Sequence, residues 1–352
     1  MEFNNKIDVI IPVYKVSDEM LNKCLSSIAC QSIIKDITVT VVDDATPDRT
    51  YDDIINNFKS IMDIQLFRME TNGGPGVARQ YALDRTFNEY VAFADADDTL
   101  DNTYSLQKLR YALTMDGNHF QMAVGFFKEA IIVQRDHPDE MAFLDHEEDM
   151  VWLFGKLYRR AIIEKFNIRF HPTSRANEDA GFNAQMQLCL DRAEVNFIEE
   201  FLYCWHDNPD SITRFNNYKY AHDSSKNASF YGYVENMIYT VKHAREVNPN
   251  NIDYINFYGC RVMQFLYTYY LECCQYGPED APKNLEWCKL YYNEIFKDTY
   301  EAINKEHFMQ GYVDAMIHLY EGHINTPFIP HITFWQFIDL CKEDYVNYEE
   351  EK

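Results

Sequence analysis

Three carboxylates, Asp95, Asp97 and Asp98, stand at the end of an apolar run that begins at Tyr90. The β-branched and aromatic residues of this run predict a buried strand. Carboxylates at the end of such a strand repel one another and are costly to remove from water, and a bound divalent cation would relieve that cost. The same residues also fit a polar turn in which Asp97, Asp98 or Thr99 caps the next helix. The spacing Asp-x-Asp does not by itself separate a metal site from a cap.

Two further segments carry groups that suit a nucleotide. Asp44 follows the run Ile37–Val42, where it would accept a hydrogen bond from a base or ribose, or act as an ordinary turn aspartate. The run Asn72-Gly-Gly-Pro-Gly76 allows close approach of the backbone, and the helix expected after it points free N–H groups at a ligand. Arg79, one turn into that helix, adds a cation suited to a diphosphate, unless it lies on a solvated face. The sequence lacks Gly-x-Gly-x-x-Gly and a phosphate loop ending in Gly-Lys-Ser/Thr, so the common dinucleotide and triphosphate sites are excluded.

A candidate base stands further along the chain. Glu178 and Asp179 head a predicted helix, where acids match the helix dipole. Alternatively, Asp179 is a general base, kept ionised by that dipole and by nearby cations. His206 could contact a phosphate, although a structural histidine is the commoner outcome. His318 and His323 lack the glutamate of the zinc-protease signature.

The elements that position these groups alternate along the first hundred residues. Four apolar runs predict strands, at 7–13, 37–42, 64–68 and from residue 90, with amphipathic helices between them. This alternation is typical of a mostly parallel sheet covered by helices, in which ligands bind beyond the carboxyl ends of the strands. The segments at those ends are Pro12-Val13, Asp43-Asp44, Asn72-Gly73-Gly74 and Asp95 to Asp98. The sequence therefore predicts an α/β fold with one ligand crevice.

The pattern changes after residue 100. Helices are expected over 106–113 and from residue 178, and short strands at 122–127, 130–133, 195–198 and 201–205. From residue 215 onward apolar residues recur at helical spacing, without a strand pattern. We therefore expect three segments, 1–100, 101–214 and 215–352, the last of them all-α.

The composition narrows the class of protein. The chain has 352 residues, of which 47% are hydrophobic and 25% charged, as in ordinary globular proteins. Its formal charge of −24 disfavours non-specific attraction to nucleic acid or anionic membrane. Nine scattered cysteines without a Cys-x-x-Cys pair indicate a reducing compartment. The first residues do not resemble a signal peptide, and no apolar stretch is long enough for a membrane span, so the cytoplasm is the expected location.

Together the motifs resemble family 2 glycosyltransferases with the GT-A fold, in the order of that family and over roughly the first 214 residues. The resemblance covers the opening strand that cradles the base (Val9-Ile-Ile-Pro12-Val13-Tyr14), the nucleotide-binding aspartate segment (Val42-Asp-Asp44-Ala-Thr46), the stretch Asn72-Gly73-Gly74-Pro-Gly-Val-Ala-Arg79, the metal-binding Asp95-Ala96-Asp97, and the acceptor-side Lys156-Leu-Tyr158, Glu178-Asp179 and His206…Ser211-Ile-Thr213. Gln80 departs from the family, which has Asn there. The helical region after residue 214 carries no matching motif.

The resemblance implies an inverting transfer from a nucleotide sugar, and a UDP-sugar is the usual donor in this family. Asp179, beside Glu178, would deprotonate an acceptor hydroxyl. Asp97, helped by Asp95, would hold Mn²⁺ or Mg²⁺ against the departing diphosphate. Residues 1–100 would bind the donor and 101–214 the acceptor, where we expect Trp152, Lys156 and His206.

Two other functions stay open at this level. Asp95-Ala-Asp-Asp-Thr99 also fits the nucleophile loop of haloacid-dehalogenase-like phosphatases, with Asp95 as nucleophile, although three strand-like segments precede it here. A non-catalytic sugar-binding module is the second alternative, and it would need neither a base nor a metal. Binding of UDP distinguishes the transferase from the phosphatase.

The acceptor is also open. A surface glycan such as capsule, O-antigen or teichoic acid is the usual acceptor, and a hydroxymethylated base in phage DNA is a second hypothesis. The charge of −24 counts against DNA unless a local basic surface is present, for which the candidates are Lys156, Arg159, Arg160 and Arg175. The helices after residue 214 could bind acceptor, form a homo-oligomer or dock a partner.

Overall fold

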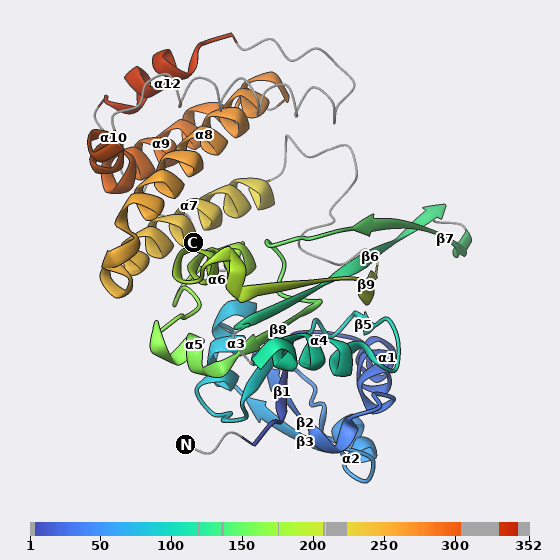
Figure 1. Cartoon of the computed structure of the whole chain (residues 1–352). Coiled ribbons are helices and arrows are strands. Elements are labelled where there is room, and N and C mark those ends of the chain that lie inside the picture. The colour runs from blue at the N-terminus through green and yellow to red at the C-terminus, as the bar shows by residue number, and fades with distance from the viewer. Residues whose placement is uncertain are drawn as a thin grey trace. The chain divides into compact units, whose positions relative to one another are not determined.

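The computed structural model describes residues 4–117, 120–134, 137–174, 176–206, 208, 224–276, 278–303 and 331–343. The chain divides into two compact units, Met1–Arg214 and Phe215–Lys352. Figure 1 labels the helices and strands of both units. Each unit is described by itself.

The first unit is built on one nine-stranded sheet (Figure 1). Its strands are β1 (Ile7–Val13), β2 (Ile37–Asp43), β3 (Asp63–Arg68), β4 (Tyr90–Phe93), β5 (Thr99–Leu100), β6 (Met122–Gln134), β7 (His137–His146), β8 (Lys156–Arg159) and β9 (Val195–His206). Its helices are α1 (Asp18–Ala29), α2 (Asp52–Phe58), α3 (Pro75–Leu83), α4 (Ser105–Thr114), α5 (Arg160–Lys165) and α6 (Glu178–Cys189).

The first half of the sheet is parallel. The strand order is β3-β2-β1-β4-β8-β6-β9-β5, and β1 pairs in parallel with both β2 and β4, as β2 does with β3. Consecutive residues of β1, such as Val9, Ile10 and Ile11, are all buried because helices cover both faces. The four predicted strands of this half are confirmed, and their carboxyl ends meet at one edge.

The second half is mixed and departs in detail from the expected elements. The two short strands expected at 122–127 and 130–133 are one strand, β6, and those at 195–198 and 201–205 are one strand, β9. Charged Lys128 and Glu129 continue β6 because each has a partner, Asp101 at 3.1 Å and His146 at 3.0 Å. The hairpin strand β7 and the short strand β8 were not predicted. β8 lies antiparallel between β4 and β6, and thereby joins the two halves.

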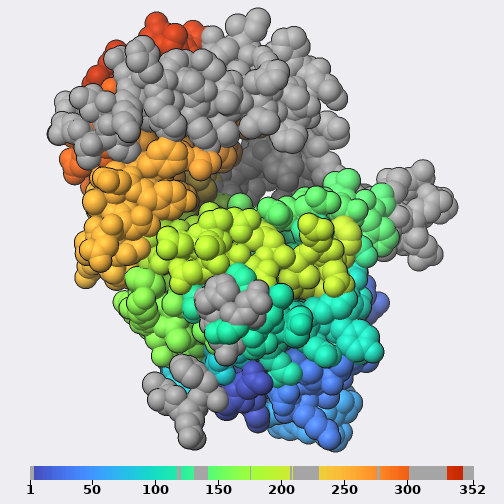
Figure 2. Space-filling view, in the orientation of Figure 1, coloured from blue at the N-terminus to red at the C-terminus, as the bar shows by residue number. Residues whose placement is uncertain are grey.

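Helix α4 packs against β9 on the surface of the first unit. Asn196 of β9 donates from Nδ2 to the carbonyl of Ala112 at 3.0 Å, and Lys108 pairs with Glu200. Figure 2 shows the teal atoms of α4 beside the yellow-green atoms of β9. Helix α4 therefore covers part of strand β9.

The second unit is helical throughout the residues that the structure describes, as predicted. Its helices are α7 (Ser224–Val247), α8 (Ile252–Tyr276), α9 (Ala281–Tyr291), α10 (Lys297–Ile303) and α12 (Phe334–Cys341). Aromatic side chains fill its core, where Tyr267 packs on Phe334 and Phe337 at centroid distances of 5.5 and 5.3 Å. Among the described helices of either unit, none has the length and apolarity needed to cross a membrane.

Candidate active site

The three carboxylates of the turn after β4 lie in different surroundings: Asp98 is buried, whereas Asp95 and Asp97 are half-buried. Asp98 is 1% exposed, and its two oxygens accept hydrogen bonds from Tyr203 Oη at 3.0 Å and from the His206 N–H at 2.8 Å. Burial, with the charges of Asp97 and Asp95, raises the pKa of Asp98 well above its usual range. Asp95 and Asp97 are half-buried and remain at the sheet edge. The turn leads into β5, and α4 begins only at Ser105, so none of these residues caps a helix.

Asp44 organises the glycine turn before α3. Its carboxylate accepts hydrogen bonds from the N–H groups of Gly73 and Gly74 at 2.7 and 2.8 Å, and from Asn72 Nδ2 at 3.0 Å. Gly74 has φ 91°, a conformation that favours glycine, and Pro75 opens the helix. Asp44 is 3% exposed. These three contacts of the carboxylate are with the turn itself, and a contact with a base or ribose stays a prediction.

The end of β1 lies next to this turn. The Asp44 N–H donates to the Val13 carbonyl at 2.9 Å. Pro12 is half-buried, and Tyr14 is 42% exposed beside Lys15. The structure therefore brings together three of the segments predicted to hold a nucleotide: Pro12 to Tyr14, Asp44, and Asn72 to Gly74.

Arg79 joins the two sides of the site. Its Nη2 donates to Asp95 at 2.5 Å, and its Nη1 donates to Glu178 at 2.6 Å and to Asp179 at 3.0 Å. Arg79 is only 3% exposed, so it does not lie on a solvated helix face, which was the alternative to a ligand contact. The guanidinium of Arg79 forms ion pairs with three carboxylates. This geometry does not support its predicted contact with a diphosphate.

Close packing of two helices brings the carboxylates to Arg79. Glu178 and Asp179 are the first residues of α6, and α6 meets α3 at Gly76. A Cβ on Gly76 would lie 2.9 Å from the Glu178 Cβ, closer than packed atoms approach. Glycine at position 76 therefore allows the start of α6 to reach Arg79.

Asp179 is a stronger base than its place at a helix start suggests. Burial raises its pKa well above the usual range, Arg79 lowers it, and the charges of Glu178 and Asp95 raise it again. The expectation that the helix dipole and cations dominate is corrected here, because burial outweighs them. A carboxylate with a raised pKa accepts a proton more readily.

Trp152 belongs to an aromatic cluster with Phe154, Tyr203 and Trp205. Its ring lies 5.1 Å from Trp205 and 5.8 Å from Phe154, and Phe154 stacks on Tyr203 at 4.6 Å. Asn183 of α6 donates from Nδ2 to the Trp152 carbonyl at 2.8 Å. This bond ties the cluster to the helix that carries Asp179.

Lys156 is buried and does not lie on the surface. It is 1% exposed, with its Nζ 3.4 Å from the Phe154 carbonyl and 3.8 Å from Asp149. Burial lowers the pKa of Lys156 to about 8, although the carboxylates of Asp149 and Asp179 raise it. Its expected contact with an acceptor is therefore not supported by its position.

Comparisons with known proteins identify the fold and the family. Residues 8–174 match the family model described as "Glycosyl transferase family 2". These residues belong to glycosyl transferase family 2. The match spans the glycine turn, the Asp95 to Asp98 turn and Lys156. It gives no support to the phosphatase alternative with Asp95 as nucleophile.

Relatives of the family 2 domain include named glycosyltransferases. The uncharacterized glycosyltransferase EpsJ of Bacillus subtilis is 26% identical over 225 residues, which is 59% of this chain and 62% of that protein. The poly(ribitol-phosphate) beta-N-acetylglucosaminyltransferase TarS of Staphylococcus aureus is 28% identical over 209 residues, 56% of this chain and 35% of that protein. The chain thus spans less than two thirds of the length of these relatives.

Solved structures show that the family 2 domain has the GT-A fold. A crystal structure of S. aureus TarS 1–349 in complex with UDP-GlcNAc superimposes with a TM-score of 0.60 at 19% identity, covering 88% of this chain and 87% of that chain. A second TarS structure gives 0.58 and covers 88% of this chain and 53% of that one. The predicted α/β GT-A architecture is therefore confirmed.

Asp95 and Asp97 of the family 2 domain fit a hard cation whose remaining ligands come from a bound phosphate and water. Among the described residues, no cluster of three or more His, Cys, Asp and Glu side chains could hold a metal on its own. Asp95 and Asp97 nevertheless give two carboxylates, and their combined charge contributes to the raised pKa of the neighbouring Asp98. Mg²⁺ and similar ions commonly take one or two carboxylates and complete their shell with phosphate oxygens and water. Asp97 also accepts a hydrogen bond from Asn208 Nδ2 at 2.7 Å.

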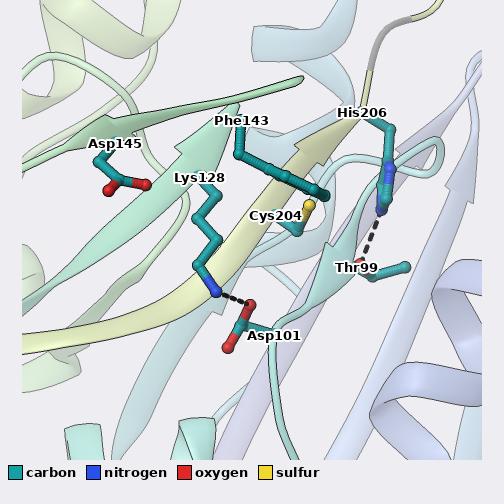
Figure 3. A pocket seen from close by; sticks show the side chains of 7 residues that line it. All are labelled: Thr99, Asp101, Lys128, Phe143, Asp145, Cys204 and His206. Atoms are coloured by element: carbon teal, nitrogen blue, oxygen red, sulfur yellow. Dashed lines mark hydrogen bonds and ion pairs between the residues drawn. The ribbon is translucent and has the colours of Figure 1, made fainter. Parts of the chain in front are cut away.

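His206 lies on the other side of β9 from the aromatic cluster. Trp205 and His206 are successive residues of the strand, so their side chains point to opposite faces. His206 borders a separate cavity of about 390 Å³, lined also by Thr99, Asp101, Lys128, Phe143, Asp145 and Cys204 (Figure 3). Its Nε2 lies 2.9 Å from Thr99 Oγ1. The structure thus separates His206 from Trp152, with which it was grouped, while Ser211 to Thr213 lie outside the described residues.

Lys156, Arg159 and Arg160, the described candidates for a basic DNA-binding surface, do not form such a surface. Arg160 is 6% exposed and pairs with buried Asp8 at 2.8 Å, and Arg159 pairs with Glu89 at 2.8 Å. Lys156 is buried, as described above. These cations stabilise the interior, because a buried carboxylate such as Asp8 needs a partner. Arg175 lies outside the described residues.

Sequence reasoning missed several residues of the site. Tyr203 supports the Asp95 to Asp98 turn, because its hydroxyl accepts from the Asp95 N–H at 2.9 Å and donates to Asp98. Asn183, Trp205 and Asn208 were also not selected. The pairing of β5 with β9, at Thr99 with Cys204, brings Tyr203 close to the turn although it lies about a hundred residues further along the chain. In the sequence, the one indication of these residues is Asn183, a polar residue within the helix predicted from residue 178.

Proposed function

We propose that the protein is an inverting glycosyltransferase that moves a sugar from a UDP-linked donor to an acceptor hydroxyl. The observation that carries the proposal is the position of Arg79, which joins Asp95 of the donor-side turn to Glu178 and Asp179 at the start of α6. In this assignment residues 1–100 bind the donor and 101–214 bind the acceptor. The second unit, helical over its described residues, has no assigned role.

The chemistry assigned to each residue follows from its surroundings. Asp179 accepts the proton of the acceptor hydroxyl, the freed oxygen bonds to the anomeric carbon, and the bond from that carbon to the diphosphate breaks. Asp95 and Asp97 would hold a Mn²⁺ or Mg²⁺ ion, which neutralises the charge of the leaving diphosphate. Arg79 fixes Asp179 and Asp95 in one arrangement. Attack from the side opposite the leaving group inverts the anomeric centre.

Nucleotide-dependent thermal stability tests this function. The melting temperature is measured with UDP, GDP, CDP and ADP, each with Mn²⁺ and with chelator. A ligand that binds only the folded state stabilises it, by about 2.7 kcal/mol at one hundred times its Kd. We expect UDP with Mn²⁺ to give the largest rise. No rise with any nucleotide would overturn the transferase assignment.

A further inference from the structure

Two half-buried indole rings, those of Trp152 and Trp205, form a surface that we call the indole platform. Their centroids lie 5.1 Å apart and the rings are tilted by 44°. Phe154 packs behind both, at 5.8 Å from Trp152 and 6.0 Å from Trp205. The rings are therefore held in place before any ligand binds.

The platform lies between the two halves of the proposed catalytic centre. On one side, Phe154 stacks on Tyr203, whose hydroxyl binds the Asp95 N–H and the Asp98 carboxylate. On the other side, the Trp152 carbonyl is bound by Asn183, about one helical turn beyond Asp179 on α6. A ligand on the platform would thus lie beside the donor-side turn and the proposed base.

The chemistry of the platform favours a sugar ring. One face of a pyranose carries mostly C–H groups, and such a face packs on an aromatic ring through dispersion and removal of apolar surface from water. An acyclic alditol phosphate has no flat apolar face, and its many rotatable bonds would lose more conformational freedom on binding. Preformed rings therefore select a cyclic saccharide.

The charges around the platform disfavour a polyanion. Glu129 stands directly opposite Trp205 in the β6–β9 pairing and binds His146 at 3.0 Å. Buried Lys156 faces Asp149 at 3.8 Å, and Asp149 directly follows the acidic residues Glu147 and Glu148 in the chain. The Lys156 ammonium thus already has a carboxylate partner, and the chain as a whole carries −24. Phosphates brought to this surface would meet like charge, which lowers affinity and association rate.

We propose that the acceptor is a non-phosphorylated glycan, with one pyranose ring stacked on Trp152 and Trp205. The proposal rests on the glycosyl transfer proposed above and names the acceptor class that the same site takes. It separates this chain from the relative TarS, which is described as a poly(ribitol-phosphate) transferase.

Calorimetric titration of the full chain with UDP and Mn²⁺ tests the platform. The neutral probes are cellotetraose, chitotetraose and maltotetraose, and the anionic probe is a ribitol-phosphate hexamer. We expect at least one neutral probe to bind and the hexamer not to bind. Trp205→Ala and Trp152→Ala should each weaken that binding about tenfold or more, equal to about 1.4 kcal/mol, and Trp205→Phe should retain part of it.

The control is Phe87→Ala, which removes an aromatic ring that is 79% exposed elsewhere in the same unit and should leave binding unchanged. The rise in melting temperature with UDP, measured on each variant, shows that the variant is folded and tests the transferase assignment separately. If UDP stabilises the protein but no neutral probe binds, or only the hexamer binds, the acceptor proposal is overturned. The same conclusion follows if both tryptophan variants bind like the unmodified protein.

Discussion

Arg79 Nη1 lies 3.0 Å from Asp179 Oδ1, although the two residues are 100 positions apart in the chain. The same guanidinium also binds Glu178 and Asp95. The position of the proposed base and that of the donor-side aspartate therefore depend on one buried side chain. In this respect Arg79 is a positioning residue that acts through Asp95 and Asp179.

Substitution Arg79→Met should destabilise the protein by about 3–5 kcal/mol, because removing one partner of a buried ion pair leaves the other charges uncompensated. Arg79→Lys should recover little, since a single ammonium cannot reproduce three forked contacts. The free energy of unfolding in urea measures both. Arg85→Met, on an exposed residue just beyond α3, is the control and should change stability by less than about 0.5 kcal/mol. Equal stability of Arg79→Met and the unmodified protein would contradict the described ion pairs.

Substitution Asp179→Asn should lower turnover about 10²- to 10⁴-fold while UDP binding is kept, because an amide cannot accept the proton. Since burial raises the pKa of Asp179, turnover of the unmodified protein should fall with acid at a higher pH than an ordinary carboxyl would give. A pH profile of initial rates checks this. Asp84→Asn, an exposed carboxylate at the end of α3, serves as control. Unchanged turnover in Asp179→Asn would remove the base assignment, whereas UDP binding without any turnover by the unmodified protein would favour a non-catalytic sugar-binding module.

Substitution Asp44→Ala should destabilise the protein by about 2–4 kcal/mol and abolish the UDP-induced rise in melting temperature. The N–H groups of Gly73 and Gly74 lose a charged acceptor, and the turn that precedes α3 loses its shape. Glu70→Ala, an exposed carboxylate just before this turn, should change neither quantity. Retention of UDP binding by a folded Asp44→Ala protein would show that the turn is not part of the donor site.

Substitution Asp97→Asn should remove the metal-dependent part of UDP stabilisation. An amide is a weaker ligand than a carboxylate for a hard cation, while its oxygen can still accept from Asn208. Melting temperatures are compared with UDP plus Mn²⁺ and with UDP plus chelator. Asp145→Asn, an exposed carboxylate on β7, is the control. If Mn²⁺ still enhances UDP binding to the variant, the ion is held elsewhere.

The buried ammonium of Lys156 predicts a specific pH dependence of stability. Its pKa is lowered from 10.5 to about 8, so between these values the unfolded chain holds a proton that the folded chain has released. Unfolding then takes up a proton, and the free energy of unfolding rises with pH by up to about 1.4 kcal/mol per unit, relative to Lys156→Met. Below pH 8 the difference between the two proteins is constant. A difference between the two proteins that stays constant from pH 8 to 10 would contradict the lowered pKa of the buried Lys156 ammonium.

The local pattern of the sequence was sufficient for the parallel half of the fold. Runs of β-branched residues such as Ile7–Val13 form strands wherever both faces are covered, and alternation with helices imposes parallel pairing. Parallel pairing is enough to place Pro12, Asp44, Asn72 and Asp95 at one edge of the sheet. The helical spacing of apolar residues after residue 215 was also sufficient to predict helices there, because this periodicity depends only on residues close together in the sequence.

Contacts between distant residues were decided only by the tertiary structure. Nothing in the sequence near Arg79 indicates that it meets carboxylates 16, 99 and 100 residues away. Nor does the sequence near Lys156 indicate that this side chain is buried. The side of β9 on which His206 lies follows from strand register, which depends on the irregular pairing of β6 with β9. Periodicity determines which residues share a face of an element, but the partner of that face is set by long-range packing, where the free energy of burial is gained.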